Sequence, residues 1–216
     1  MTLRKRRREQ TEDYILAAAT KEFSARGYHG VSMDDIAKAV DCAPATLYGY
    51  FKGKSELFTR LMTEKAQLYL MGVTDAVTGA GDFRAGLTAY LEHFLGFGRE
   101  NEAFLKLMIN VMRGGDCLDI PDAEQVEQAK KMYRGLIAGL MKTGIDEGSL
   151  REENTTLLAL SFLGQVHAMS IAWLEDETAG GGANLESVVR LAEQQFLYGA
   201  THKSPGNDLP KAGTGA

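Results

Sequence analysis

The chain of 216 residues contains little cysteine, little proline and no long uninterrupted apolar run. Its two cysteines, Cys42 and Cys117, are too few for a disulfide framework or a cysteine-based metal site, so we expect a reducing, cytoplasmic environment. No apolar run approaches the roughly 18 residues of a membrane span. The basic start is followed by acidic residues rather than by the apolar core of a secretion signal, so we expect no membrane partner.

Motifs of several enzyme classes are also missing. The sequence has no glycine-rich phosphate loop, no His-Glu-x-x-His zinc motif and no nucleophile elbow. Its histidines and carboxylates form no constellation that is visible in the sequence. We therefore expect no catalytic residues, no cofactor and no metal, and an all-helical enzyme is kept only as an alternative.

Apolar residues recur at spacings of three and four along almost the whole chain, which is typical of helices. The pattern predicts an all-α fold of about nine helices, with a small N-terminal head and a larger helical body. The expected helices cover residues 11–26, 33–40, 44–51, 54–71, 82–99, 101–113, 121–147, 152–176 and 184–200. The expected divisions are a basic arm (1–10), a helix-turn-helix domain (11–53), a ligand-binding and dimerisation domain (54–202) and a disordered tail (203–216).

Charge is divided unevenly along the chain. The net charge is −5, but residues 1–60 carry 11 Lys and Arg against 8 Asp and Glu. A basic head on an acidic body indicates that the head meets a polyanion such as double-stranded DNA. Five cations are consecutive: Arg4, Lys5, Arg6, Arg7 and Arg8. We interpret them as an arm that lies along phosphates or enters a minor groove, with a solvated tail as the alternative.

Two short predicted helices in the head are joined by a tight turn. Ser32 and Asp35 occupy the two positions of a capping box at the start of the first helix. The turn Asp41-Cys42-Ala43 leads into Pro44, whose fixed φ suits the first turn of a helix. Two helices joined in this way are typical of a helix-turn-helix, whose second helix enters the major groove of DNA.

The second of these helices is expected to have an anchored side and an exposed side. Leu47 and Phe51, four positions apart, would hold it to the rest of the head. The hydroxyls of Thr46, Tyr48 and Tyr50 would then point away, where they can bind phosphates. Ordinary surface or core tyrosines are the alternative.

The segment from about Glu12 to Met62 resembles the DNA-binding head of the TetR family of bacterial transcriptional regulators. The resemblance rests on the stretch FSARGYHGVSMDDIAKAVDCAPATLYGYFKGKSELFTRLM, with its Gly-Tyr, Asp-Ile-Ala and Thr-Leu-Tyr-x-Tyr-Phe patterns. It covers about a quarter of the chain and implies a DNA-binding regulator, most often a repressor, that responds to a small molecule. The resemblance places the following residues at contacts with the DNA backbone: Ser32, Thr46, Tyr48, Tyr50 and Lys54.

This chain departs from the family pattern in the turn and in the second helix. The family usually has Gly where this chain has Asp41, often Ser where it has Ala43, and commonly a large residue where it has Gly49. Pro44, Ala45 and Gly49 offer almost no hydrogen-bond donors to base edges. We therefore predict that bases are read through apolar contact with thymine methyls and through groove shape.

The middle helices contain aromatic and methionine side chains of the kind that line adaptable apolar pockets. The expected ligand-binding residues are Phe94, Phe97, Phe104, Met108, Met112, Tyr133, Phe162, His167, Met169 and Trp173. His93, Asn110 and Gln165 add polar points. Ordinary core packing is the alternative for each residue, and a regulator without a small-molecule effector is the alternative function.

The last two predicted helices are apolar on more than one side, which indicates a second partner beyond the core of the chain itself. The expected residues of a homodimer interface are Leu160, Leu163, Val188, Ala192 and Phe196. The resemblance agrees, because in TetR relatives the last two helices pair with their mates as a four-helix bundle. A dimer would place two heads on a palindromic operator, and a simple interior helix is the alternative.

Overall fold

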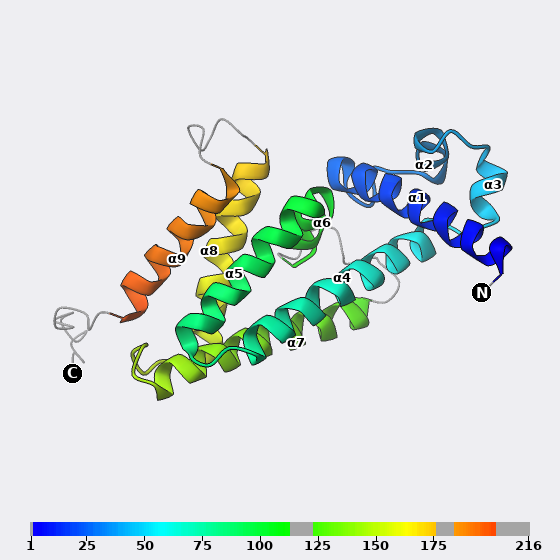
Figure 1. The fold of residues 1–216 in the computed structure, drawn as a ribbon. Coiled ribbons are helices and arrows are strands. Elements are labelled where there is room, and N and C mark those ends of the chain that lie inside the picture. The colour runs from blue at the N-terminus through cyan, green and yellow to red at the C-terminus, as the bar shows by residue number, and fades with distance from the viewer. Residues whose placement is uncertain (1, 113–122, 176–183, 202–216) are drawn as a thin grey trace, which may run out of the picture.

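The computed structural model describes residues 2–112, 123–175 and 184–201, and the regular elements within these ranges are all α-helices. The helices are α1 (Leu3–Arg26), α2 (Met33–Ala39), α3 (Pro44–Tyr48), α4 (Lys54–Thr78), α5 (Phe83–Glu100), α6 (Glu102–Met112), α7 (Ala123–Asp146), α8 (Thr155–Glu175) and α9 (Leu185–Thr201). Figure 1 shows α1, α2 and α3 at one end of the molecule and α8 and α9 at the other, with α4 extending away from the first group. The predicted all-α fold is confirmed. Cys117 and the expected tail, residues 203–216, lie outside the described residues.

α1 begins at Leu3 rather than near residue 11, so the basic segment forms the first turns of this helix. Arg, Lys, Gln and Glu are strong helix formers, and the guanidinium of Arg8 pairs with the carboxylate of Glu12 one turn later at 2.8 Å. The helix ends at Gly27, whose φ of 70° is readily adopted by glycine. The cations are therefore held on a rigid element.

α2 and α3 form the expected helix-turn-helix. The capping box at the start of α2 is present: the Asp35 amide donates to Ser32 Oγ at 3.1 Å, and the Ser32 amide donates to the Asp35 carboxylate at 2.9 Å. Asp41 in the turn has a φ of 52°, the left-handed conformation that Asp tolerates. α3 ends at Tyr48 instead of residue 51, and its buried Leu47 holds it in the core of the head.

α4 continues to Thr78 instead of ending at residue 71, and it passes through Gly72 without a break. The ring of His93 from α5 occupies the space beside Gly72, where an added Cβ would lie 2.1 Å from the ring carbon Cε1. His93 Nε2 is also 3.1 Å from the backbone oxygen of Tyr69. A glycine inside a helix costs about 1 kcal/mol relative to alanine. Here the close packing of α5 on α4 offsets that cost, so the helix continues.

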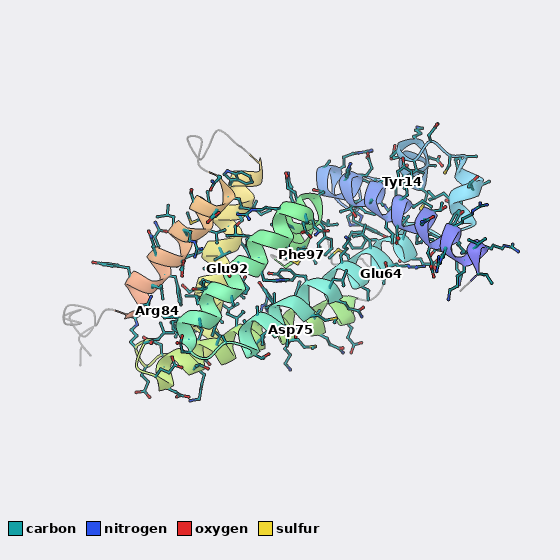
Figure 2. The ribbon with its side chains drawn as sticks, in the orientation of Figure 1. Tyr14, Glu64, Asp75, Arg84, Glu92 and Phe97 are labelled. Atoms are coloured by element: carbon teal, nitrogen blue, oxygen red, sulfur yellow. The ribbon has the colours of Figure 1, made fainter. Side chains whose placement is uncertain are left out.

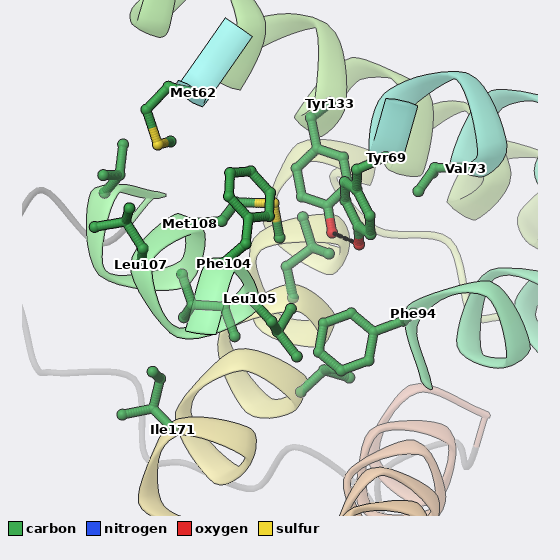
Figure 3. Packing of buried hydrophobic residues seen from close by; sticks show 14 of the residues in the cluster. Met62, Tyr69, Val73, Phe94, Phe104, Leu105, Leu107, Met108, Tyr133 and Ile171 are labelled. Carbon is green, nitrogen blue, oxygen red and sulfur yellow. Dashed lines mark hydrogen bonds between the residues drawn. The ribbon is translucent and has the colours of Figure 1, made fainter. Parts of the chain in front are cut away.

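The body is built around the contacts of α5, α7 and α8. α5 packs against α4 and α7, α8 packs against α7 and α9, and α6 lies against α5. Figure 2 shows the side chains along these helices, with Phe97 labelled on α5. Figure 3 shows part of the buried cluster, in which Tyr69, Phe104, Met108 and Tyr133 lie close together. α6 also packs against α1, so the head contacts the body through α6 as well as through α4.

α8 is strongly apolar along its length. Its stretch Thr155–Trp173 is, by length and composition, the one helix within the described residues that is apolar enough to cross a membrane, with a mean hydropathy of 1.3. The expectation from the sequence considered only uninterrupted apolar runs, and this stretch is interrupted by polar residues such as Gln165 and His167. α8 packs against α6, α7 and α9, and 44% of the stretch is buried, as in the core helix of a bundle.

Candidate functional site

The exposed side of α3 carries small and hydroxyl-bearing residues. Its exposed residues are Pro44, Ala45, Thr46 and Tyr48, followed by Gly49. Leu47 and Phe51 are fully buried, as the sequence predicted, and Tyr50 is half-buried against the core. The positions expected to face DNA therefore lie together on one accessible surface, except that Tyr50 is partly withdrawn from it.

An open depression of about 460 Å³ adjoins this surface. It brings together three residues that were expected to contact DNA, each from a different helix or its start: Ser32 before α2, Tyr48 at the end of α3 and Lys54 at the start of α4. Asp34 and Asp35 lie in the same wall. The helix-turn-helix thus presents both donors and acidic groups beside α3.

The donors of Ser32 are already used inside the head. Its hydroxyl donates to the Asp35 carboxylate at 2.6 Å and its amide donates to the same oxygen at 2.9 Å. The two bonds from Ser32 are the main reason that the pKa of Asp35 falls from 3.8 to about 2, and the guanidinium of Arg26 at 3.3 Å adds to the effect. A phosphate contact by Ser32 requires its hydroxyl to turn away from Asp35.

Lys54 is held in place by the residue that follows Gly27. Its ammonium donates to the backbone oxygen of Tyr28 at 2.9 Å and lies 4.4 Å from the centroid of the Tyr28 ring. An ammonium has three N–H donors, so one bond to the protein leaves donors for a phosphate. The head therefore fixes the direction of this cation at the rim of the depression.

The basic segment Arg4–Arg8 is exposed and adjoins the end of α3 (Figure 1). Arg8 is the residue of this segment that contacts the region: its Nη2 lies 3.4 Å from the backbone oxygen of Gly49, and its guanidinium lies 5.4 Å from the centroid of the Tyr50 ring. The segment places its positive charge at the end of α3, beside the surface formed by the exposed residues of that helix.

The body contains a buried polar group of four residues, which we call the tyrosine cluster: Tyr69, Tyr90, Tyr133 and His167. The hydroxyl of Tyr133 on α7 lies 3.2 Å from the hydroxyl of Tyr69 on α4 and 2.7 Å from that of Tyr90 on α5. It also lies 3.3 Å from Nε2 of His167 on α8. Figure 3 shows the bond between Tyr69 and Tyr133 among apolar side chains. The hydroxyl of Tyr133 therefore joins four helices.

Burial keeps these phenols protonated. It raises the pKa of Tyr69 to about 12 and raises the pKa values of Tyr90 and Tyr133 well above the ordinary 10. A phenol can donate one hydrogen bond and accept two, so the three partners of Tyr133 use its full capacity.

Most residues that were expected to line a ligand site lie in this part of the body. Those that are buried are Phe94, Phe104, Met108, Tyr133, Phe162 and His167, and those that are partly buried are Phe97, Met169 and Trp173. The side chains of Met112 and Asn110 lie outside the described part of the structure. The sequence analysis missed Tyr69 and Tyr90. The sequence pattern that indicates their burial is a spacing of four residues on one helix face, from Tyr69 to Val73 and from Tyr90 to Phe94.

α8 and α9 expose apolar side chains, but most of these are not the residues that the sequence predicted for a dimer interface. The strongly exposed ones are Leu157 (63%), Leu160 (41%), Leu191 (46%) and Tyr198 (73%). Among the expected interface residues, Leu160 is exposed and Val188 is half-buried, whereas Leu163, Ala192 and Phe196 are buried within the chain. Because α8 and α9 pack against each other, part of their apolar surface is already covered.

The comparisons with known proteins agree with this arrangement. Residues 15–61 match the family described as bacterial regulatory proteins, tetR family. The chain is 24% identical over 184 residues to the uncharacterized HTH-type transcriptional regulator YhgD of Bacillus subtilis (strain 168), covering 82% of this chain and 95% of that protein.

Solved structures extend the similarity to the fold of the body. The ketosteroid transcriptional regulator KstR2 of Mycobacterium tuberculosis matches with a TM-score of 0.74 at 18% identity, over 89% of this chain and 96% of that chain. The fatty acid degradation regulator FadR of Bacillus halodurans matches with a TM-score of 0.65 at 22% identity, over 86% of this chain and 94% of that chain. The likeness therefore includes both head and body.

Proposed function

We propose that the chain, whose residues 15–61 match the tetR family of bacterial regulatory proteins, is a DNA-binding repressor of that family that binds a palindromic operator as a homodimer. In this proposal, an apolar ligand enters the body and releases the operator. The observation that carries the proposal is the exposed side of α3, with small residues and hydroxyls beside the cations of α1 and α4. We divide the chain into a DNA-binding domain over residues 11–53 and a ligand-binding and dimerisation domain over residues 54–202.

In the complex, α3 lies in the major groove and its flanks hold the phosphates. The backbone contacts are Ser32, Thr46, Tyr48, Tyr50, Lys54 and the basic segment Arg4–Arg8. Hydroxyls and cations of this kind fix the register of a protein on the duplex without reading its sequence. Pro44, Ala45 and Gly49 face the bases, and their lack of donors favours readout through thymine methyls and groove shape.

The dimer interface uses the exposed side of α8 and α9. A single α3 reads too few base pairs for specificity, and a two-fold dimer doubles the site. Leu157, Leu160 and Leu191 are large apolar side chains that this chain leaves exposed, which supports a second copy as their partner. Half-buried Val188 lies beside them in the proposed interface, whereas Leu163, Ala192 and Phe196 support α8 and α9 from behind.

The ligand is an apolar molecule with one hydrogen-bonding group, bound where α4, α5, α7 and α8 meet. Tyr69 and Tyr90 of the tyrosine cluster supply hydrogen bonds to that group, and the surrounding aromatic and methionine side chains hold the apolar part. The names of KstR2 and FadR refer to ketosteroids and to fatty acid degradation. Ketosteroids and fatty acids both have an apolar skeleton that carries oxygen, which supports a ligand of this chemical kind.

Release follows from the position of α4, which runs from the head into the body (Figure 1). A ligand that takes a hydrogen bond from Tyr69 shifts α4 and thereby changes the separation of the two heads. The heads must match half-sites about 34 Å apart, so a small shift weakens operator binding. The coupling is reciprocal, and a value of roughly 1–3 kcal/mol corresponds to a 5- to 150-fold change in affinity.

The DNA-binding part of the proposal is tested by selecting binding sequences from random DNA with the purified protein. The expected result is a palindromic motif whose gel retardation weakens as salt rises. Thr46→Ala and Tyr48→Phe should each weaken binding by roughly 2- to 10-fold, because each removes one hydrogen bond to a phosphate. Tyr14→Phe is the matched control, since Tyr14 is an exposed tyrosine on α1. Failure to enrich any sequence contradicts the proposal.

The ligand part is tested by adding long-chain carboxylic acids, their coenzyme A thioesters and ketosteroids to the complex with the selected DNA. One of these classes should release the DNA, and the same DNA should weaken binding of that compound by the same factor. Equal affinity of the compound for free and DNA-bound protein contradicts the mechanism.

We place the protein in the cytoplasm, with the chromosome, as a regulator and not as an enzyme.

A further inference from the structure

Glu12 of α1 is a carboxylate buried between two helices. Its side chain is 8% exposed and makes two ion pairs: one to Arg8 at 2.8 Å on the same helix and one to Arg60 at 2.9 Å on α4. A buried charge is expensive unless it is paired and hydrogen-bonded. The two arginines therefore have a fixed partner, and Glu12 links the first half of α4 to α1.

These contacts belong to a chain of four alternating charges, which we call the charge chain: Glu64, Arg60, Glu12 and Arg8. Arg60 also pairs with Glu64 one turn further along α4 at 2.7 Å. At the other end, Arg8 reaches the backbone oxygen of Gly49 at 3.4 Å and the Tyr50 ring at 5.4 Å from its centroid. The charge chain thus runs from α4, which carries Tyr69 of the tyrosine cluster, to the end of α3.

The charge chain is neutral in sum, because its two arginines balance its two glutamates. Arg60 is bound by two carboxylates, and the hydrogen bond that it donates to Glu64 is the main reason that its pKa is raised. Its guanidinium also lies 5.9 Å from the centroid of the ring of Phe51, the residue after Tyr50. Both arginines therefore border the segment that follows α3, and both are held there by Glu12.

We propose that Glu12 is a positioning residue that ties the orientation of α3 to the position of α4 through its two arginines. The inference rests on the proposed function, because it concerns how the DNA-reading helix follows the connecting helix. When α4 shifts, Arg60 and Glu12 move with it, and Arg8 carries the displacement to Gly49 and Tyr50. Without Glu12, α3 is held by its apolar anchors alone and its orientation to α4 is less defined.

The substitution Glu12→Gln tests this role, because a pure charge effect and a loss of positioning change the affinity for the selected DNA in opposite directions. Removing a negative charge near DNA raises affinity for any DNA. Loss of positioning instead weakens binding to the selected operator by roughly tenfold, within the range reported for residues in coupling networks. Glu9→Gln is the matched control, since Glu9 lies three residues earlier on α1 and loses the same charge but takes no part in the charge chain.

The measured quantity is the ratio of the dissociation constants for random and selected DNA at one salt concentration. We expect Glu12→Gln to lower this ratio, Glu9→Gln to leave it unchanged, and thermal unfolding to show that both variants are folded. Arg60→Gln should lower the ratio in the same way, and Arg60→Lys should restore part of it because the charge is kept. If Glu12→Gln does not fold, the two Arg60 variants test the positioning role instead. The side chain of Arg60 is 42% exposed, so its substitution should leave the protein folded.

Two failures are distinguishable. A wild-type protein that selects no DNA contradicts the proposed function. A wild-type protein that selects DNA, with Glu12→Gln and Arg60→Gln retaining the wild-type ratio, contradicts the positioning role and leaves the function intact.

Discussion

The head and the body place their polar groups in opposite directions. In the head, a small apolar core that includes Ile36 and Leu47 supports α3, whose Thr46 and Tyr48 face the solvent. In the body, the hydroxyls of the tyrosine cluster face inward and are surrounded by apolar side chains. The same chemical group, a hydroxyl, is therefore used on the surface of one region and in the interior of the other.

The difference follows from the size of what each region is proposed to bind. A DNA duplex is a large polyanion that a protein meets at its surface, where hydroxyls and cations can reach phosphates. A small apolar ligand is bound by enclosure, where a few polar groups fix its orientation. α4 belongs to both arrangements, because Lys54 lies at the rim of the depression beside α3 and Tyr69 lies in the tyrosine cluster.

The largest effect is expected from Leu47→Ala, which removes the buried anchor of α3. The loss of a fully buried leucine side chain costs about 2–5 kcal/mol of unfolding free energy. Because the core of the head is small, DNA binding should be lost while the body stays folded. Urea unfolding combined with gel retardation checks this. Thr46→Ala on the same helix is the control for the unfolding measurement alone, because the side chain of Thr46 is exposed. An unchanged unfolding curve would show that α3 is not anchored as described.

The next largest effect concerns the contact of α4 with α5. Gly72→Ala places a Cβ 2.1 Å from Cε1 of His93, so the ring must move and its bond to the backbone oxygen of Tyr69 is lost. We expect a destabilisation of about 1–3 kcal/mol. Gly96→Ala is the matched control on α5, since a Cβ there meets nothing within 4 Å, and it should be neutral or stabilising. Equal behaviour of the two variants would contradict the packing argument.

Tyr133→Phe tests the role of the inward-facing hydroxyls of the body, in contrast to the exposed hydroxyls of the head. It removes the hydroxyl that Tyr69, Tyr90 and His167 share, so each of these buried polar groups loses one hydrogen-bond partner. The expected loss is about 1–3 kcal/mol of unfolding free energy, and Tyr90→Phe should cost less because the other two bonds of Tyr133 persist. The measurement is urea unfolding at neutral pH, and an identical loss for both variants would argue against Tyr133 as the shared partner.

The smallest effect is expected from acid on the capping box of the head. The pKa of Asp35 is about 2 in the folded protein against an ordinary 3.8, so the unfolded chain binds the extra proton first as the pH falls. Its contribution is fully present above pH 3.8 and is lost as the pH falls toward 2. In urea unfolding between pH 5 and pH 2, Asp35→Asn should therefore show a weaker pH dependence than the wild type. Parallel curves would mean that Asp35 contributes nothing in this range.

The features predicted correctly from the sequence are those that depend on near neighbours. The capping box of Ser32 and Asp35, the tight turn through Asp41 and the buried Leu47 all follow from residues a few positions apart. The length of α4 could not be predicted in this way, because a glycine such as Gly72 disfavours a helix by about 1 kcal/mol and only packing against another helix offsets that cost. His93, from α5, supplies that contact.

The same limit applies to the body. The sequence shows that α8 and α9 are apolar on several sides, but packing between them decides which side is covered. Phe196 and Leu163 face the interior, whereas Leu157 and Leu191 are exposed. The tyrosine cluster likewise forms from four helices, so no local pattern could identify Tyr69 and Tyr90 as partners of Tyr133.

The most direct test of the central claim is photo-crosslinking from a single benzoylphenylalanine residue to the selected operator. The residue is placed at position 45 on the exposed side of α3 or, in the control, at position 132 on α7, where Met132 is 70% exposed. Our account predicts crosslinks to bases in both half-sites from position 45 and none from position 132. Crosslinks from position 132 with none from position 45 would contradict it.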